Sequence, residues 1–209
     1  MPSRRIAHLS DLHAGAADDA SLQRLVRAVL RSGADRVAIT GDVTHRGRAA
    51  ELDQFRRAFA PLLENGRAVI VPGNHDRLGD DLEAELMPGE RVQVSAGHPL
   101  PLPEEDLIER LVSRLGWPNA AELPIGLELL RRVRHRCDLV LHGHRHAPAE
   151  LRPFACEAPL RVFNGGSSTE LQAFRVFDVE GERVDTCWID ARAEEGTANE
   201  PLRILSRAA

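Results

Sequence analysis

The chain contains no lysine and no tyrosine, so all 27 of its basic residues are arginine. These absences exclude a lysine Schiff base, the lysine of a phosphate-binding P-loop and a tyrosine nucleophile. Cysteine is also scarce: Cys137, Cys156 and Cys187 are far apart and form no CxxC pair. We therefore expect reduced thiols, which are typical of the cytoplasm rather than of a disulfide-linked secreted protein.

Long apolar runs are lacking as well. No segment of the sequence approaches the ~20 consecutive apolar residues that a membrane-spanning helix needs. The apolar run behind the first arginines ends at Ser10 and is too short for a signal peptide. The net charge of −5 gives no broad attraction to nucleic acid or to an anionic membrane. We expect a cytoplasmic protein with no membrane partner, and nucleic acid is disfavoured as a partner.

The apolar pattern alternates between strands and helices in the first part of the chain. Strands are expected at 4–10, 35–40 and 67–71, and helices at 18–33 and 49–64, where apolar residues recur on one face. This alternation predicts a parallel or mixed sheet covered by helices. Further helices are expected at 103–116 and 124–134, and a strand at 138–142.

Short strands follow residue 150, at 160–164, 171–179 and 183–189, separated by turn-forming sequences. This spacing is typical of antiparallel sheet. We predict one domain over residues 1–191 and a polar C-terminal tail over residues 192–209.

Metal-ligand residue types stand at the ends of four expected strands. The four groups are Asp11 and His13; Gly41-Asp42; Gly73-Asn74-His75-Asp76; and Gly143-His144-Arg145-His146. Each group alone has an ordinary explanation as a turn or a loop. Together they indicate a ligand site, because the carboxyl ends of strands form the binding crevice of open α/β sheets. Imidazole with carboxylate favours zinc, manganese or iron over magnesium or calcium.

Taken in this order, the four groups resemble the motifs of the calcineurin-like metallophosphoesterase superfamily. The resemblance implies an α/β fold, a two-sheet αββα sandwich of mixed strands flanked by helices, with a dinuclear centre of Mn, Fe or Zn ions at the C-terminal ends of the strands. It implies that the first ion is held by Asp11, His13 and His146, that Asp42 bridges both ions, and that Asn74 and His144 hold the second.

The same resemblance implies that His75 lies near the leaving-group oxygen and that Asp76 orients it. The implied reaction is attack of a metal-bound hydroxide on a small phosphomonoester or phosphodiester substrate. Two alternatives stay open. One is a nuclease of the same superfamily, which the acidic charge balance disfavours. The other is a catalytically impaired binding scaffold.

The sequence departs from the superfamily pattern at Gly97-His98. The second ion usually has one more histidine from this region, and Gly97 stands at the position that we align with it. The stretch from residue 77 to His98 is short, as if an internal segment were missing between the GNHD and GHxH motifs. Three alternatives remain: His98 is a ligand after a register shift, the second ion has fewer protein ligands, or the second site is empty and activity is weak.

Three histidines outside these ligand sets receive separate interpretations. His8 lies inside an apolar strand and is expected in the core. His45 is expected in a solvated loop, with a contact to substrate phosphate as the alternative. His142 precedes the glycine turn and is expected to support the site or to pack.

Overall fold

The computed structural model describes residues 4–64, 66–80, 82–86, 126–181 and 183–193. The helix expected at 103–116, His98 and most of the predicted tail lie outside these residues. The chain divides into two compact units. The larger comprises Met1–Glu90, Leu141–Ala149 and Phe163–Leu205, and the smaller comprises Arg91–Val140, Glu150–Val162 and Ser206–Ala209. Each is described separately below.

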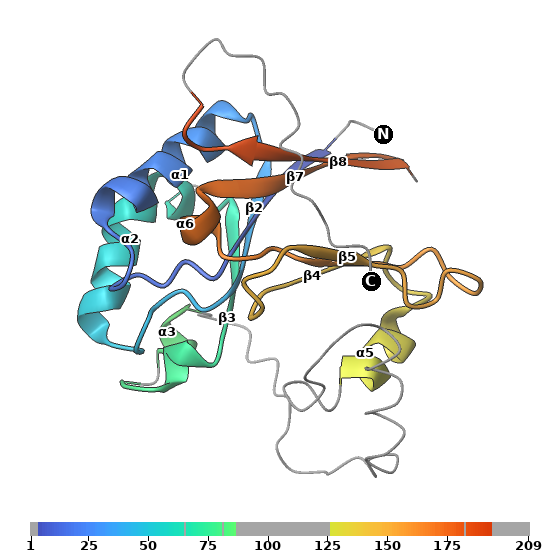
Figure 1. Ribbon diagram of the computed structural model, residues 1–209, viewed down its shortest axis with the longest axis horizontal. Coiled ribbons are helices and arrows are strands. Elements are labelled where there is room, and N and C mark those ends of the chain that lie inside the picture. Colours follow the sequence, from blue (N-terminus) through green and yellow to red (C-terminus); the bar gives the residue numbers. More distant parts are fainter. Residues whose placement is uncertain (1–3, 65, 81, 87–125, 182, 194–209) are drawn as a thin grey trace. The chain divides into compact units, whose positions relative to one another are not determined.

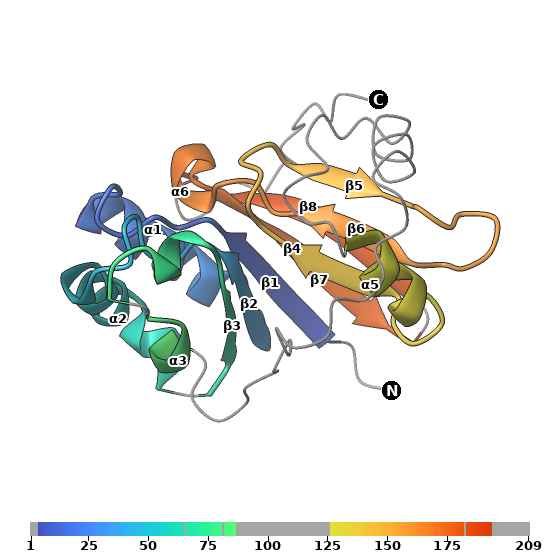
Figure 2. The same cartoon turned by 90° about the horizontal axis from the view of Figure 1, so that it is seen from below.

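The larger unit is built on a five-stranded sheet in the order β3-β2-β1-β7-β8 (Figures 1 and 2). Its strands are β1 (Arg4–Ser10), β2 (Arg36–Gly41), β3 (Ala68–Pro72), β7 (Ala173–Glu180) and β8 (Arg183–Asp190). β2 runs parallel to both β1 and β3, whereas β7 is antiparallel to both β1 and β8. Because β1, β2 and β3 are parallel neighbours, their carboxyl ends meet at one edge of the sheet.

Two helices, α1 (Asp19–Arg31) and α2 (Ala49–Leu63), lie beside each other next to this sheet (Figure 1). The side chain of Asp18 accepts a hydrogen bond from Ser21 N and caps the start of α1, since a first-turn amide has no partner inside a helix. Pro61 lies in the last turn of α2, and the helix ends two residues later.

The apolar faces of these helices form the core of the larger unit. Leu25 from α1 and Phe55 and Phe59 from α2 are fully buried in one cluster with Leu9 of β1 and Ile39 of β2. The rings of Phe55 and Phe59 lie 4.8 Å apart between centroids. Burial of a large apolar side chain stabilises a fold by about 1.5–3 kcal/mol, so this cluster fixes the sheet whose edge carries the site.

A second sheet has three strands in the order β4-β6-β5: β4 (Leu139–His142), β6 (Arg161–Asn164) and β5 (Ala149–Leu151). In the smaller unit, Leu130 of helix α5 (Gly126–Val133) packs with Leu160 and Val162 in a small apolar cluster. The predicted α/β class, with two sheets and covering helices, is confirmed.

Short helical segments complete the described chain: η1 (His75–Arg77), α3 (Glu83–Leu86) and α6 (Ser168–Leu171). The sequence did not predict these segments or β5. Within the described ranges, no helix combines the length and the apolar character needed to cross a membrane.

Candidate metal centre

The loops after β1, β2, β3 and β4 are tied together by hydrogen bonds to two buried carboxylates. The Asp11 carboxylate accepts from Asp42 N at 3.1 Å and from His144 N at 2.9 Å. Asp42 Oδ1 accepts from His75 N at 2.8 Å. Residues that are up to 133 positions apart in the sequence therefore converge at the edge predicted from the strand ends.

A first group of metal-ligand types consists of Asp11, His13 and His146, whose ligand atoms all lie within 4.8 Å of one another. His13 Nε2 lies 3.0 Å from His146 Nε2 and 3.9 Å from Asp42 Oδ2. Asp11, His13 and Asp42 are buried, whereas His146 is exposed. Burial lowers the pKa of His13, against the opposing effect of the Asp42 carboxylate. A lowered pKa favours neutral imidazole, which is the form that binds metals.

The remaining expected ligands, Asn74 and His144, also come together. His144 Nδ1 lies 3.0 Å from Asn74 Oδ1, and both residues are exposed. The structure thus brings all six predicted ligand positions to one edge, and these two are the more accessible. His98, the possible additional ligand, lies outside the described residues.

Glycines make room for the two carboxylates. A Cβ on Gly41 would collide with Asp11 Oδ1, and a Cβ on Gly73 would collide with Asp42 Oδ1. Gly143 is equally restricted, since a Cβ there would lie 2.8 Å from Asp11 Oδ2. The close approach of backbone and carboxylate, together with the converging imidazoles, fits a divalent cation with nitrogen and oxygen ligands.

Backbone strain is concentrated at this edge. Asp11, His13 and His144 have φ values of 48°, 47° and 78°, in the left-handed region that side chains other than glycine rarely adopt. Such conformations cost on the order of 1–3 kcal/mol each and persist at functional sites where the surrounding fold imposes them.

The position of Asp76 corrects one expectation. Its carboxylate is fully buried and accepts four hydrogen bonds, from Val43 N, Thr44 N, Thr44 Oγ1 and Gly73 N, at 2.6 to 3.2 Å. Both oxygens are therefore already engaged by the loops after β2 and β3. Asp76 holds these loops together and does not orient the imidazole of His75.

The imidazole of His75 is held instead by a main-chain group. His75 Nδ1 lies 2.7 Å from the carbonyl oxygen of His45, and His75 Nε2 lies 4.0 Å from Asp42 Oδ2. A carbonyl only accepts, so Nδ1 carries the hydrogen in this contact. His75 thus lies beside Asp42, and its ring is held by the main chain of His45.

Two further residues lie near the expected ligands. The sequence did not single out Glu170, and it placed His45 in a solvated loop. Glu170 of α6 accepts from His146 Nδ1 at 2.8 Å, which directs His146 Nε2 toward His13. The ring of His45 lies 5.6 Å from that of His13 and 5.9 Å from that of His75. His13, His45 and His75 form the second group of potential metal ligands within the described part of the chain.

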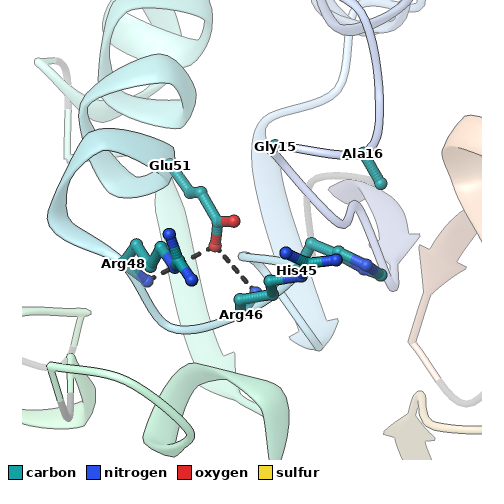
Figure 3. Close-up of a pocket in the computed structure, with 6 residues that line it drawn as sticks. All are labelled: Gly15, Ala16, His45, Arg46, Arg48 and Glu51. Carbon is teal, nitrogen blue, oxygen red and sulfur yellow. Dashed lines mark hydrogen bonds between the residues drawn. The ribbon is translucent and has the colours of Figure 1, made fainter.

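His45 also lines a cavity of about 340 Å³ together with Gly15, Ala16, Arg46, Arg48 and Glu51 (Figure 3). Glu51 Oε2 accepts from the main-chain N–H groups of Arg46 and Arg48, at 2.7 and 3.3 Å, and thereby fixes the wall of the cavity (Figure 3). Space for a substrate group therefore adjoins the candidate ligands.

His8 and His142 lie behind the site. His8 is buried, as expected, and its Nε2 lies 2.9 Å from Thr40 Oγ1. His142 is partly buried, and its Nδ1 lies 3.4 Å from Asn164 Nδ2. Burial lowers the pKa of His142. These contacts are those of packed, supporting side chains.

Comparison with known proteins gives one family match. The sequence model of the calcineurin-like phosphoesterases matches residues 4–148. No curated protein matches the chain. Among solved structures, Vps29 from Cryptosporidium parvum is 14% identical and has a TM-score of 0.47, with 93% of each chain covered. Vps29 from Chaetomium thermophilum is 15% identical, with a TM-score of 0.42 and coverage of 88% of this chain and 95% of that one. Because the family match spans well over half of the sequence and includes every motif described above, the chain belongs to the calcineurin-like phosphoesterases.

Proposed function

We propose that this chain is a metal-dependent hydrolase of a small phosphomonoester or phosphodiester. The observation that carries the proposal is the convergence of Asp11, His13, His146 and Asp42, with two buried carboxylates closely fitted against glycines. In this proposal Asp11, His13 and His146 hold one ion, Asp42 is shared, and Asn74 and His144 hold a second. Mn, Fe and Zn suit this set of nitrogen and oxygen ligands. Two such ions would activate water and stabilise charge on the phosphoryl oxygens.

The protein's own groups position the reaction. With the hydrogen of His75 Nδ1 directed to the His45 carbonyl, Nε2 is the ring nitrogen left to face a substrate oxygen. We propose that protonated His75 donates from Nε2 to the leaving-group oxygen. Asp76 supports this step indirectly, by holding the loop that carries His75.

Accessibility divides the proposed ligands into two sets. Of the ligands of the first ion, Asp11, His13 and the shared Asp42 are buried and His146 alone is exposed, whereas Asn74 and His144 of the second ion are both exposed. We therefore propose that the second ion is held more weakly and that purified protein contains fewer than two ions per chain. Elemental analysis after dialysis tests this, and two full equivalents per chain would contradict it.

The proposal also covers the bounds of the catalytic domain and its location in the cell. We propose that residues 1–191 form the phosphoesterase domain, followed by the tail 192–209. Free Cys137, Cys156 and Cys187 support a reducing, cytoplasmic location.

Hydrolysis of p-nitrophenyl phosphate and bis-p-nitrophenyl phosphate with added Mn²⁺ tests the function. We expect turnover that depends on metal and falls by more than about 100-fold in Asp42→Asn, since loss of an outer partner alone costs 10- to 100-fold. Asp53→Asn, on the exposed side of α2, is the matched control and should retain full activity. Metal binding without turnover on either substrate would contradict the hydrolase and favour a binding scaffold.

A further inference from the structure

A line of buried polar side chains runs behind Asp11. Side chains alternate between the two faces of a strand, so Ala7 and Leu9 of β1 join the apolar core while His8 and Ser10 face the other way. Ser10 pairs with Thr40 in the register of β1 and β2, which places their side chains together. His8, Ser10 and Thr40 are exposed by only 1%, 0% and 5% of their surface, so bulk water does not compete for their hydrogen bonds.

The distances connect these side chains into one continuous path. His8 Nε2 lies 2.9 Å from Thr40 Oγ1, Thr40 Oγ1 lies 3.3 Å from Ser10 Oγ, and Ser10 Oγ lies 2.7 Å from Asp11 Oδ2. The path ends on a carboxylate that the proposed function assigns to the first ion.

The direction of each hydrogen bond follows from the chemistry of its members. An ionised carboxylate only accepts, so Ser10 donates to Asp11. The Thr40 carbonyl, at 3.0 Å from Ser10 Oγ, competes for this hydrogen, but a bond to a charged acceptor is shorter and stronger. Ser10 Oγ then accepts from Thr40, and Thr40 Oγ1 accepts from His8 Nε2.

His8 supplies the hydrogen-bond donor that Thr40 Oγ1 needs at the end of the path farthest from Asp11. Burial lowers the pKa of His8 to about 3, so the ring is neutral and carries a single hydrogen. Among the described residues, His8 Nδ1 is buried without a hydrogen-bond partner. A ring with its hydrogen on Nε2 leaves only an acceptor unmatched at Nδ1 and supplies the donor that Thr40 needs.

The backbone closes tightly around the path. A Cβ on Gly165 would lie 2.5 Å from Ser10 Cβ and 3.0 Å from His8 Cε1, and a Cβ on Gly143 would collide with Ser10 Oγ. The path is therefore enclosed by main chain on two sides, which supports its geometry.

We propose that His8, Thr40 and Ser10 are positioning residues that form a one-directional hydrogen-bond relay and fix Asp11 for metal binding. The proposal rests on the proposed function in that Asp11 is taken as a metal ligand. Consecutive hydrogen bonds polarise one another in a low-dielectric interior, so the relay strengthens the contact that holds Asp11 Oδ2. Its loss weakens metal binding without removing any ligand.

Thr40→Val tests the relay, because valine keeps the shape of threonine and removes the hydroxyl that links His8 to Ser10. We expect the dissociation constant for Mn²⁺, measured by titration calorimetry on the full chain, to rise by about 10-fold or more, as found for outer partners of metal ligands. Thr186→Val on β8 is the matched control, since the Thr186 hydroxyl has no hydrogen-bond partner in the described chain. Ser10→Ala provides a second break in the relay if Thr40→Val fails to fold, as judged by circular dichroism.

A second readout needs no metal. Nitrogen-15 NMR of the histidine rings should show His8 as the neutral Nε2–H form from pH 5 to 8, and its Nε2 hydrogen should exchange faster in Thr40→Val. An Nδ1–H form, or Mn²⁺ binding within twofold of the unsubstituted chain in both relay variants, overturns the relay. If the unsubstituted chain binds no Mn²⁺, the proposed function fails instead, and the ring measurement still decides the relay.

Discussion

Replacing Asp76 by asparagine separates a role in holding the loops from a role in catalysis. The substitution keeps the size of the side chain but converts one carboxylate oxygen into an NH2 group, which donates and does not accept. If the NH2 group replaces Oδ2, it faces two donors, Val43 N and Gly73 N. If it replaces Oδ1, it faces one donor, Thr44 N, because the Thr44 hydroxyl can turn and accept from it.

The expected loss follows from the burial of these groups. Hydrogen bonds to charged groups contribute about 1.5–3 kcal/mol each, and a buried donor left without an acceptor loses its solvation as well. Loss of one or two such bonds predicts a destabilisation of roughly 1.5–6 kcal/mol. A natural domain has a free energy of unfolding of about 5–15 kcal/mol, so Asp76→Asn removes a large share of it.

Urea denaturation followed by circular dichroism measures the effect. With a slope of roughly 2–3 kcal/mol per molar urea, the midpoint should fall by about 0.5–3 M. Asp53→Asn, which changes the same charge at an exposed position on α2, should move the midpoint little. A midpoint for Asp76→Asn equal to that of Asp53→Asn, combined with lost hydrolysis, would refute the reasoning and restore a direct catalytic role.

Three further predictions follow from single contacts. His8 has its ordinary pKa of 6.5 in the unfolded chain, and burial lowers its pKa to about 3 in the folded chain. The stability contributed by neutral, buried His8 is therefore complete above pH 6.5. Below pH 6.5 the free energy of unfolding falls by about 1.4 kcal/mol per pH unit. In urea titrations at pH 4.5 and 7.5, His8→Leu should reduce the difference between the two midpoints, and an unchanged difference would contradict this. Glu170→Gln should weaken Mn²⁺ binding by about 10-fold in calorimetry, because an amide orients His146 less strongly than a carboxylate, and equal affinity would argue against the contact. Gly41→Ala should lower both the unfolding midpoint and Mn²⁺ affinity, because its φ of +77° and the nearness of Asp11 exclude a side chain; a midpoint as high as that of the unsubstituted chain would exclude this strain.

The sequence predicts the strands and their ends well for a physical reason. Buried strands such as β2 are short apolar runs, and a polar residue after a glycine marks where the run ends. Parallel neighbours share an edge, so Asp11, Asp42 and Asn74 could be placed together from their positions alone. The approach of His144 to the same edge could be predicted from the motif order but not from strand pairing.

The partner of His75 could not be predicted, because adjacent residues in a tight turn point in different directions. His75 and Asp76 both lie in the 3₁₀ segment η1, which has three residues per turn, so their side chains diverge by about 120°. Asp76 consequently points into the interior and His75 toward the site. The family resemblance implied a contact between Asp76 and the imidazole of His75 that the local geometry does not form.

The contact of Glu170 with His146 could not be predicted for a different reason. It is 24 residues from His146, and its own surroundings, Ser167 to Glu170, carry only the signature of a helix start. Helix α6 is one turn long and has no amphipathic period by which it could be located. An orienting carboxylate on such a turn becomes evident only when the fold places it against its histidine.

The carboxylates at this edge serve the fold and the proposed chemistry together. Asp11 accepts from the loops after β2 and β4, Asp42 accepts from the loop after β3, and Asp76 accepts from the loops after β2 and β3. Main-chain N–H groups that would otherwise be buried without partners are thereby satisfied by charged acceptors. The same N–H groups partly compensate the negative charge of each carboxylate. They therefore reduce the repulsion between neighbouring carboxylates. These contacts therefore fix the order of the loops that carry the proposed ligands.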